Sequence, residues 1–394
     1  MDFSFLEAQA SHRAEHELLL HCLRPDETAC DAERIRSLVT NQIDWNYLFL
    51  FAQRHAVVPL LSARLNKVAA DTVPPLELQG LQKYFQQNSA RNILLTAELC
   101  QLLELLGQEG IEAIPYKGPA LALFAYGDLS LRRFVDLDIM VRKDDVAKSI
   151  ELLLHRGYKL SKPFNANQQE VLLRTQHNLQ FRGHKGQLIV ELHWEVSSHL
   201  FASSVQAEDI WKTLITTELR GTTIKTFAPE DLIFSLTIHG CRHLWERLLW
   251  ICDVGWIATR RQLNWEKLLE RARRTKTERM MLLGLALSER LLSVDLPAVV
   301  ADEIKKDRQL EKLLMLVVKE LFRGPENQPA PPYKILEFNL KIRRSWSARA
   351  RYFRYALDPT DRDLDALVLP RSLSFGYYLM RPVRLLFKTG EDVR

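Results

Sequence analysis

The sequence predicts an α+β protein in which helical regions enclose a short segment of strands. Before residue 110 and after residue 228, apolar residues recur at three- and four-residue spacing, which is typical of amphipathic helices. Between these regions, short segments alternate apolar and polar residues, the period of a strand with one buried face. We therefore expect N-terminal helices over 1–109, an α/β core over 110–227, C-terminal helices over 228–324, and a linker with a basic aromatic tail over 325–394.

The composition indicates an ordinary globular chain. It has 394 residues, of which 47% are hydrophobic and 26% charged, and this length allows two or three domains. The net charge of +5 is modest, so we do not expect nucleic acid as a partner. The five cysteines are scattered without a C-x-x-C pair, which favours reduced thiols. With neither a secretory signal nor an apolar run long enough to span a bilayer, we expect a cytoplasmic protein.

Three helical patterns precede the predicted core. They cover residues 15–23, 43–65 and 76–106. Pro59 is expected to kink or divide the second pattern, because proline removes a helical hydrogen bond. Pro74-Pro75 interrupts the chain before the third.

A short strand pattern over 111–116 ends at Lys117-Gly118, and Pro119 follows where a helix would begin. Unpaired N–H groups point outward at such a turn, so it could bind phosphate, with Lys117 adding a positive charge. Turns of this kind are also common without any ligand, and both interpretations stay open from these residues alone.

Residues 134–141 form the clearest strand pattern, with apolar side chains on one face and Asp136 and Asp138 on the other. The two carboxylates lie one pleat repeat apart, about 6–7 Å between Cα atoms. Their repulsion would be relieved by a divalent metal, although a solvated strand face is the commoner explanation of an isolated Asp-x-Asp pair. Arg132 and Arg133, just before the strand, are either solvated loop residues or phosphate anchors.

A hairpin is expected from strand patterns over 177–182 and 187–194. In its second strand, Ile189, Glu191 and His193 share one face. Glu191 could supply the third acid of a two-metal site, or it could be an ordinary exposed strand residue.

Helical patterns return at Pro229 and continue over 265–292 and 310–321. On the first of these helices His239, Arg242, His243 and Glu246 share a stripe. We favour a packing or hydrogen-bonding role for this stripe over metal binding, because no carboxylate completes a known ligand spacing. Residues 325–332 form a proline-rich linker, and the arginine- and aromatic-rich tail after it is expected to pack on the domain, with its arginines paired or exposed.

Taken together, these motifs resemble the uncharacterised nucleotidyltransferase family of the DNA-polymerase-beta-like superfamily. The resemblance rests on Lys117-Gly118, Arg132, Asp136-Leu137-Asp138-Ile139 and Glu191-Leu192-His193-Trp194, and it extends over about residues 40–385. It implies the minimal nucleotidyltransferase fold, a mixed sheet flanked by helices.

The resemblance also implies a reaction. A nucleoside monophosphate would pass from a nucleoside triphosphate to an acceptor hydroxyl of a small molecule or protein, with release of pyrophosphate. Two Mg²⁺ ions would be held by three acids, Asp136, Asp138 and Glu191. The expected nucleotide-binding residues are Lys117, Gly118, Arg132, Arg133 and His193.

The sequence departs from the superfamily motif at the phosphate turn. Pro119 follows Gly118 where the motif has serine or glycine, and the interval from Gly118 to Asp136 is long. Gly127-Asp128 offers an alternative register, but we favour Gly118 because it follows a strand and opens a helix. The missing serine motivates a second hypothesis, a catalytically degenerate member that binds a nucleotide or a partner. A third, nucleic-acid binding through the tail, rests on its arginines and aromatics.

Overall fold

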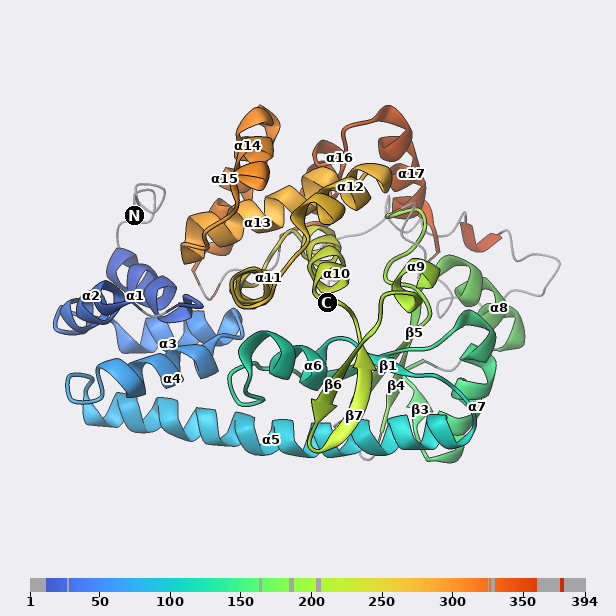
Figure 1. Cartoon of the computed structure of the whole chain (residues 1–394), viewed down its shortest axis with the longest axis horizontal. Helices are drawn as coiled ribbons and strands as arrows, with labels where there is room; N and C mark the ends of the chain where they lie inside the picture. The colour runs from blue at the N-terminus through green and yellow to red at the C-terminus, as the bar shows by residue number, and fades with distance from the viewer. Residues whose placement is uncertain are drawn as a thin grey trace.

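The computed structural model describes residues 12–26, 28–162, 165–183, 188–202, 207–324, 326, 330–359 and 376–378. It confirms the predicted fold class: a mixed sheet is flanked by helices, with helical regions before and after it (Figure 1). The predicted domain boundaries remain a prediction.

The N-terminal region contains α1 (Arg13–Leu23), α2 (Ala29–Val39), α3 (Trp45–Arg54), α4 (Val58–Val68) and α5 (Pro75–Gln108). The helix predicted over 43–65 is divided, because Ala56 adopts a positive φ of 60° and Pro59 lies in the first turn of α4. At 34 residues, α5 is about 51 Å long and runs from α4 to the sheet and α7 (Figure 1).

The central sheet has the order β1-β2-β5-β4-β3, with β2 and β5 parallel and the other pairs antiparallel. The strands are β1 (Ile114–Pro115), β2 (Asp136–Met140), β3 (Lys159–Leu160), β4 (Asn178–Arg182) and β5 (Ile189–His193). The connecting helices are α6 (Gly118–Leu121), the π-helical turn η2 (Ala122–Tyr126), the 3-10 turn η3 (Lys143–Asp145), α7 (Val146–His155) and α8 (Ala166–Thr175). The hairpin predicted over 177–194 is therefore confirmed as β4–β5, while its turn at 184–187 lies outside the described residues.

Helix α9 (Ala207–Trp211) and a second hairpin, β6 (Ile215–Leu219) with β7 (Thr222–Thr226), lead into the C-terminal helices. These are α10 (Pro229–Arg242), α11 (Leu248–Arg260), α12 (Trp265–Arg274), α13 (Glu278–Leu292), α14 (Ala298–Lys306), α15 (Arg308–Leu321), α16 (Pro332–Lys341) and α17 (Trp346–Leu357). The helix predicted over 265–292 is broken at Lys276, which has a positive φ of 57°.

The two faces of the sheet lie in different surroundings. As the alternation predicted, Leu137 and Ile139 of β2 pack with Val190 and Leu192 of β5 in one apolar cluster, together with residues of α5 and α7. The opposite face carries Asp138, whose residue surface is only 4% exposed. The solvated strand face considered for the Asp-x-Asp pair is therefore not what the structure contains at Asp138.

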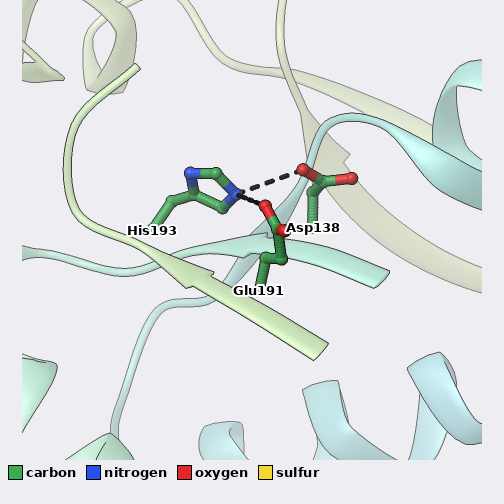
Figure 2. Close-up of side chains that lie close together, drawn as sticks. All are labelled: Asp138, Glu191 and His193. Carbon is green, nitrogen blue, oxygen red and sulfur yellow. Dashed lines mark hydrogen bonds and ion pairs between the residues drawn. The ribbon is translucent and has the colours of Figure 1, made fainter. Parts of the chain in front are cut away.

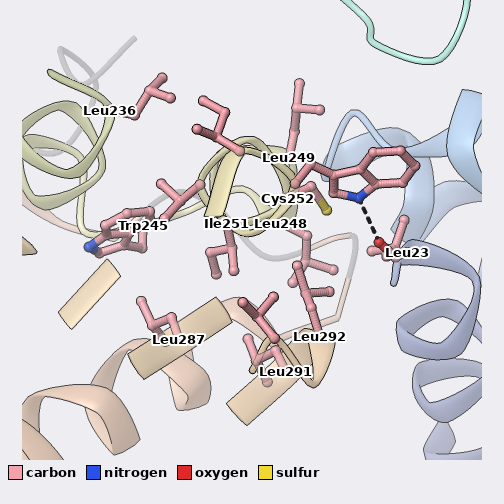
Figure 3. Packing of buried hydrophobic residues seen from close by; sticks show 14 of the residues in the cluster. Leu23, Leu236, Trp245, Leu248, Leu249, Ile251, Cys252, Leu287, Leu291 and Leu292 are labelled. Carbon is pink, nitrogen blue, oxygen red and sulfur yellow. Dashed lines mark hydrogen bonds between the residues drawn. The ribbon is translucent and has the colours of Figure 1, made fainter. Parts of the chain in front are cut away.

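The N-terminal and C-terminal helices share the larger apolar core. Leucines of α1 pack in one cluster with α11 and α13, and the indole Nε1 of Trp256 donates a hydrogen bond to the Leu23 carbonyl at 3.0 Å (Figure 3). His55 links the same regions further on: Leu248 N–H donates to its Nδ1 at 3.2 Å, and its Nε2 lies 3.1 Å from the Leu321 carbonyl. The position of α10 and α11 thus depends on helices from both ends of the chain.

Trp245 closes α10 and directs the chain toward α11. Its ring is fully buried, and its backbone N–H donates to the Gly240 carbonyl at 2.7 Å. A Cβ on Gly240 would lie 2.6 Å from ring atoms of Trp245, and one on Gly284 would lie 2.8 Å away. The two glycines therefore provide the space that this ring occupies.

Part of the tail is described, and two of the arginines that we expected to be paired or exposed, Arg343 and Arg344, are paired. Arg343 donates to the Phe201 carbonyl at 2.8 Å and lies over the rings of Phe201 and Tyr352, while Arg344 contacts Glu278 and Asp307. Much of the predicted linker, and residues 360–375 and 379–394, lie outside the described residues. Across the described part of the chain, no helix is both long and apolar enough to cross a bilayer.

Candidate active site

Two acids and a histidine meet where β2 and β5 run side by side. The register of the parallel pair places Asp138 opposite Glu191 and Met140 opposite His193. His193 Nε2 lies 3.1 Å from Asp138 Oδ1 and 3.3 Å from Glu191 Oε2 (Figure 2). Carboxylates only accept hydrogen bonds, so this geometry places a proton on Nε2. One ligand atom from each residue lies within 4.8 Å of the others, so this group could hold a metal ion once His193 Nε2 gives up that proton.

The charges in this cluster adjust to one another. Burial would raise the pKa of Asp138, but Lys117 and His193 hold it well below its usual range. Lys117 Nζ lies 3.0 Å from Asp138 Oδ1, and that carboxylate raises the pKa of the ammonium against the effect of burial. Hydrogen bonds to Asp138 and Glu191 likewise raise the pKa of His193 despite its burial. Two cationic side chains therefore neutralise the buried acids.

The Glu191 carboxylate is hydrogen-bonded to side chains of the neighbouring strand β4. Asn178 Nδ2 on β4 donates to its Oε2 at 3.0 Å, and Gln180 Nε2 lies 3.4 Å from its Oε1. Burial would raise its pKa, but the hydrogen bond from His193, together with the positive charges of His193 and Lys117, lowers that pKa overall. Glu191 is therefore a fixed member of the cluster and is not the ordinary exposed strand residue considered as an alternative.

Asp136 lies at the start of β2 and lines the same cleft without joining the compact group. Burial and the charges of Asp138 and Glu191 raise its pKa to about 6. His193, which we expected to bind nucleotide, thus contacts Asp138 and Glu191 directly, an arrangement that the sequence did not indicate. The ligand set with Asp136 remains a prediction.

Gly118 occupies a position that no other residue would fill without strain. Its φ is +54°, and a Cβ there would lie 3.2 Å from the Asp136 carbonyl oxygen. Gly118 lines the cleft and opens α6, whereas Gly127 ends η2 and is not among the cleft-lining residues. This arrangement favours Gly118 over the Gly127-Asp128 register.

The adjacent arginines point to different environments. Arg132 is buried and donates to both carboxylate oxygens of Asp253 on α11, at 2.8 and 2.9 Å. Arg133 lines the cleft, and no described residue supplies it with a hydrogen bond or an ion pair. Of these two arginines, only Arg133 has a guanidinium without a hydrogen-bond or ion-pair partner among the described residues.

All eight predicted site residues line one cleft of about 560 Å³ between the sheet and the C-terminal helices. They are Lys117, Gly118, Arg132, Arg133, Asp136, Asp138, Glu191 and His193. The sequence did not place the facing side of this cleft. We call it the helical wall and define it as His239, Arg242, His243, Glu246, Arg247 and Trp250, all of which line the cleft.

Four members of the helical wall form the stripe that we assigned to packing or hydrogen bonding. The expectation that all four lie on one helix was wrong: α10 ends at Arg242, and His243 and Glu246 follow in a turn where Leu244 and Trp245 adopt positive φ. The rings of His239 and His243 lie 4.8 Å apart, and Trp250 is 4.9 Å from His239. Burial, followed by neighbouring cationic groups, lowers the pKa of His243 to about 3 and that of His239 well below its usual range. These imidazoles are therefore neutral. The spacing of the stripe was visible in the sequence, but its direction toward the acids was not.

Comparison with known proteins gives one match. The family model described as uncharacterised nucleotidyltransferase matches residues 41–293, well over half of the chain. The matched segment contains Asp138, Glu191 and His193, the turn at Lys117-Gly118 and the helical wall. No curated protein and no solved structure matches.

Proposed function

Because this chain belongs to the uncharacterised nucleotidyltransferase family, we propose that it transfers a nucleoside monophosphate from a nucleoside triphosphate to an acceptor hydroxyl and releases pyrophosphate. Family membership supports nucleotidyl transfer as the class of reaction. The observation that carries the finer proposal is the meeting of Asp138, Glu191 and His193 within 4.8 Å in a cleft large enough for a nucleotide.

The donor atoms suit a divalent cation. Mg²⁺ prefers carboxylate oxygens, and we propose that Asp136, Asp138 and Glu191 hold two such ions. When bound, the metal would supply charge neutralisation at the phosphate oxygens and lower the pKa of the acceptor hydroxyl.

The chain's own residues would position the triphosphate. Arg133 has an uncommitted guanidinium, whose planar fork matches two phosphate oxygens. Gly118 lets the backbone approach Asp136 closely, leaving room beside the acids. Lys117 balances Asp138 and lies where it could also reach a phosphate. Arg132 would act indirectly, by holding the loop before β2 against α11.

Thermal unfolding with each of the four ribonucleoside triphosphates, with and without Mg²⁺, tests this proposal. A ligand at 100 times its Kd adds about 2.7 kcal/mol, which raises the melting temperature by several degrees. We expect a Mg²⁺-dependent rise that Asp138→Asn abolishes. Asp302→Asn, at an exposed carboxylate away from the cleft, is the matched control and should keep it. An equal rise in both variants would contradict the metal assignment.

A catalytically degenerate member of the family is the second candidate, favoured by Pro119 in place of the motif's serine. It shares the binding step but not the chemistry. Mg²⁺-dependent release of pyrophosphate from the stabilising triphosphate, lost in Asp138→Asn, would support the enzyme. Stabilisation without pyrophosphate release across a panel of hydroxyl acceptors would support the degenerate member.

A further inference from the structure

We propose that the helical wall is a second phosphate-binding surface, in which Arg242 and Arg247 bind a phosphate group of a substrate. The inference rests on the proposed function and adds residues and a ligand chemistry that the sequence motifs do not include.

The first observation is that the cationic side chains on the two sides of the cleft differ in whether they form ion pairs. On the sheet side, two of three cationic side chains are committed, Lys117 to Asp138 and Arg132 to Asp253, whereas Arg133 is not. On the helical wall, neither Arg242 nor Arg247 has a carboxylate partner in the described part of the chain. Guanidinium groups that lie in a cleft without a counterion are suited to an anionic ligand.

The second observation is that two imidazole rings connect Arg242 with the acids. Its Nη1 lies 2.7 Å from His177 Nε2, and the His177 ring is 6.0 Å from that of His193. His193 in turn contacts Asp138. Burial and then Arg242 lower the pKa of His177 well below its usual range, so this imidazole is neutral and accepts from the guanidinium. His177 thus orients the Arg242 guanidinium, and the rings of His177 and His193 lie between that guanidinium and Asp138.

The third observation is the chemistry of the remaining wall. The side-chain nitrogens of His239 and His243 have no hydrogen-bond partner among the described residues, so each neutral ring can donate one N–H to a ligand. Arg247 is exposed, and its guanidinium carbon lies 5.8 Å from the centre of the Trp250 ring. Glu246 is the wall's one acid, and the guanidinium groups of Arg247 and of Arg54 on α3 act on its charge. Several donors with little opposing charge favour phosphate oxygens.

Two sources could supply this phosphate: the donor triphosphate or a phosphorylated acceptor. The same oxygens would contact the same guanidinium groups in both cases. Tripolyphosphate probes the first source without a preference for any base. Inorganic phosphate, added after the protein is saturated with Mg²⁺ and tripolyphosphate, probes the second.

Calorimetric titration of the full chain, its Arg242→Gln and Arg247→Gln variants, and Arg91→Gln tests the inference. Arg91 is exposed on α5, outside the cleft, and controls for the loss of one positive charge. We expect at least tenfold weaker binding of one probe in Arg242→Gln, a smaller loss in Arg247→Gln, and natural affinity in Arg91→Gln. All titrations share one low ionic strength, since salt screens such contacts. Because Arg247 is exposed, we expect Arg247→Gln to fold normally, so this variant still tests the inference if Arg242→Gln is less stable.

Weakened tripolyphosphate binding would assign the wall to the donor, and weakened phosphate binding alone would assign it to the acceptor. Natural affinity for both probes in both variants overturns the inference, as does a natural protein that binds neither probe. The proposed function fails separately: it fails if Asp138→Asn leaves Mg²⁺-dependent triphosphate binding intact, whatever the arginine variants do.

Discussion

Arg132 and Asp253 form a buried, two-pronged ion pair between the loop that precedes β2 and helix α11. The Tyr126 hydroxyl donates to the same carboxylate at 2.8 Å. From the other side, Asn92 of α5 donates to the backbone carbonyls of Leu129 and Arg132, at 2.6 and 2.8 Å. The loop that delivers Asp136 and Asp138 is therefore fixed to both helical regions.

Replacing Asp253 with alanine should destabilise the protein by about 3–5 kcal/mol, because it leaves the Arg132 guanidinium buried without its counterion. Urea unfolding measures the loss. The double variant Arg132→Met/Asp253→Leu removes both charges and should be less destabilised than Asp253→Ala alone. A double variant as unstable as the sum of the two single variants would show that the pair is not coupled.

Replacing Gly118 with alanine should weaken the Mg²⁺-dependent triphosphate stabilisation and cost about 1–2 kcal/mol of folding free energy. The reason is the positive φ of 54° and the contact of an added Cβ with the Asp136 carbonyl, which the strand would have to relieve by shifting. Thermal unfolding with and without ligand separates the two effects. Gly80→Ala, in α5 with open space around its added Cβ, should be neutral or stabilising. Equal behaviour of the two alanine variants would contradict the strain at Gly118.

Replacing Gly240 with alanine should destabilise the protein by about 1–3 kcal/mol, because the added methyl group would overlap the buried ring of Trp245. Denaturant unfolding measures this loss. A compensating Trp245→Leu change creates space and should make Gly240→Ala less harmful than it is beside tryptophan. The same penalty in both backgrounds would mean that the ring is not the obstacle.

Stability should fall as the pH drops from about 6.5 toward 3, and His55 should contribute to that slope. Burial and then Arg54 lower its folded pKa to about 3, whereas an unfolded histidine has a pKa of about 6.5. Between these values only the unfolded chain binds the proton, so acid favours unfolding. Urea unfolding across this range should show a shallower slope for His55→Gln, while His155→Gln, at an exposed residue, should keep the natural slope. Identical slopes in all three proteins would contradict a neutral His55.

The sequence predicted local structure well where one physical rule dominates. Alternation gave the buried face of β2 and β5, and Pro59 marked the division between α3 and α4. Pairing is a different matter, because the period of two does not say which strands are neighbours or that β2 and β5 are parallel. The second hairpin, with its polar and threonine-rich strands, lacked a strong apolar alternation and was not predicted.

The residue types of the candidate site could be predicted from the sequence, but the ion pairs and hydrogen bonds that these residues form could not. Acids at a short spacing indicated a metal site, and all eight predicted residues line one cleft. That Arg132 is bound to Asp253 could not be predicted, because the two residues are 121 positions apart in the chain. The spacing of His239, Arg242, His243 and Glu246 was recognised, but the end of α10 at Arg242 was not. Which way these polar side chains face depends on packing, and packing is set by the whole core.

The hydrogen bond from Trp256 to the Leu23 carbonyl has a consequence for dissecting the molecule. The segment that the family shares begins after α1, yet Leu18, Leu19, Leu20 and Leu23 are fully buried in the common core. A fragment trimmed to residues 41–293 would leave an indole N–H without its acceptor and uncover the apolar surface that these leucines fill. It would also lose Leu321, the carbonyl partner of His55. We therefore expect that residues 41–293, the segment matched by the family model, do not fold on their own and aggregate when expressed.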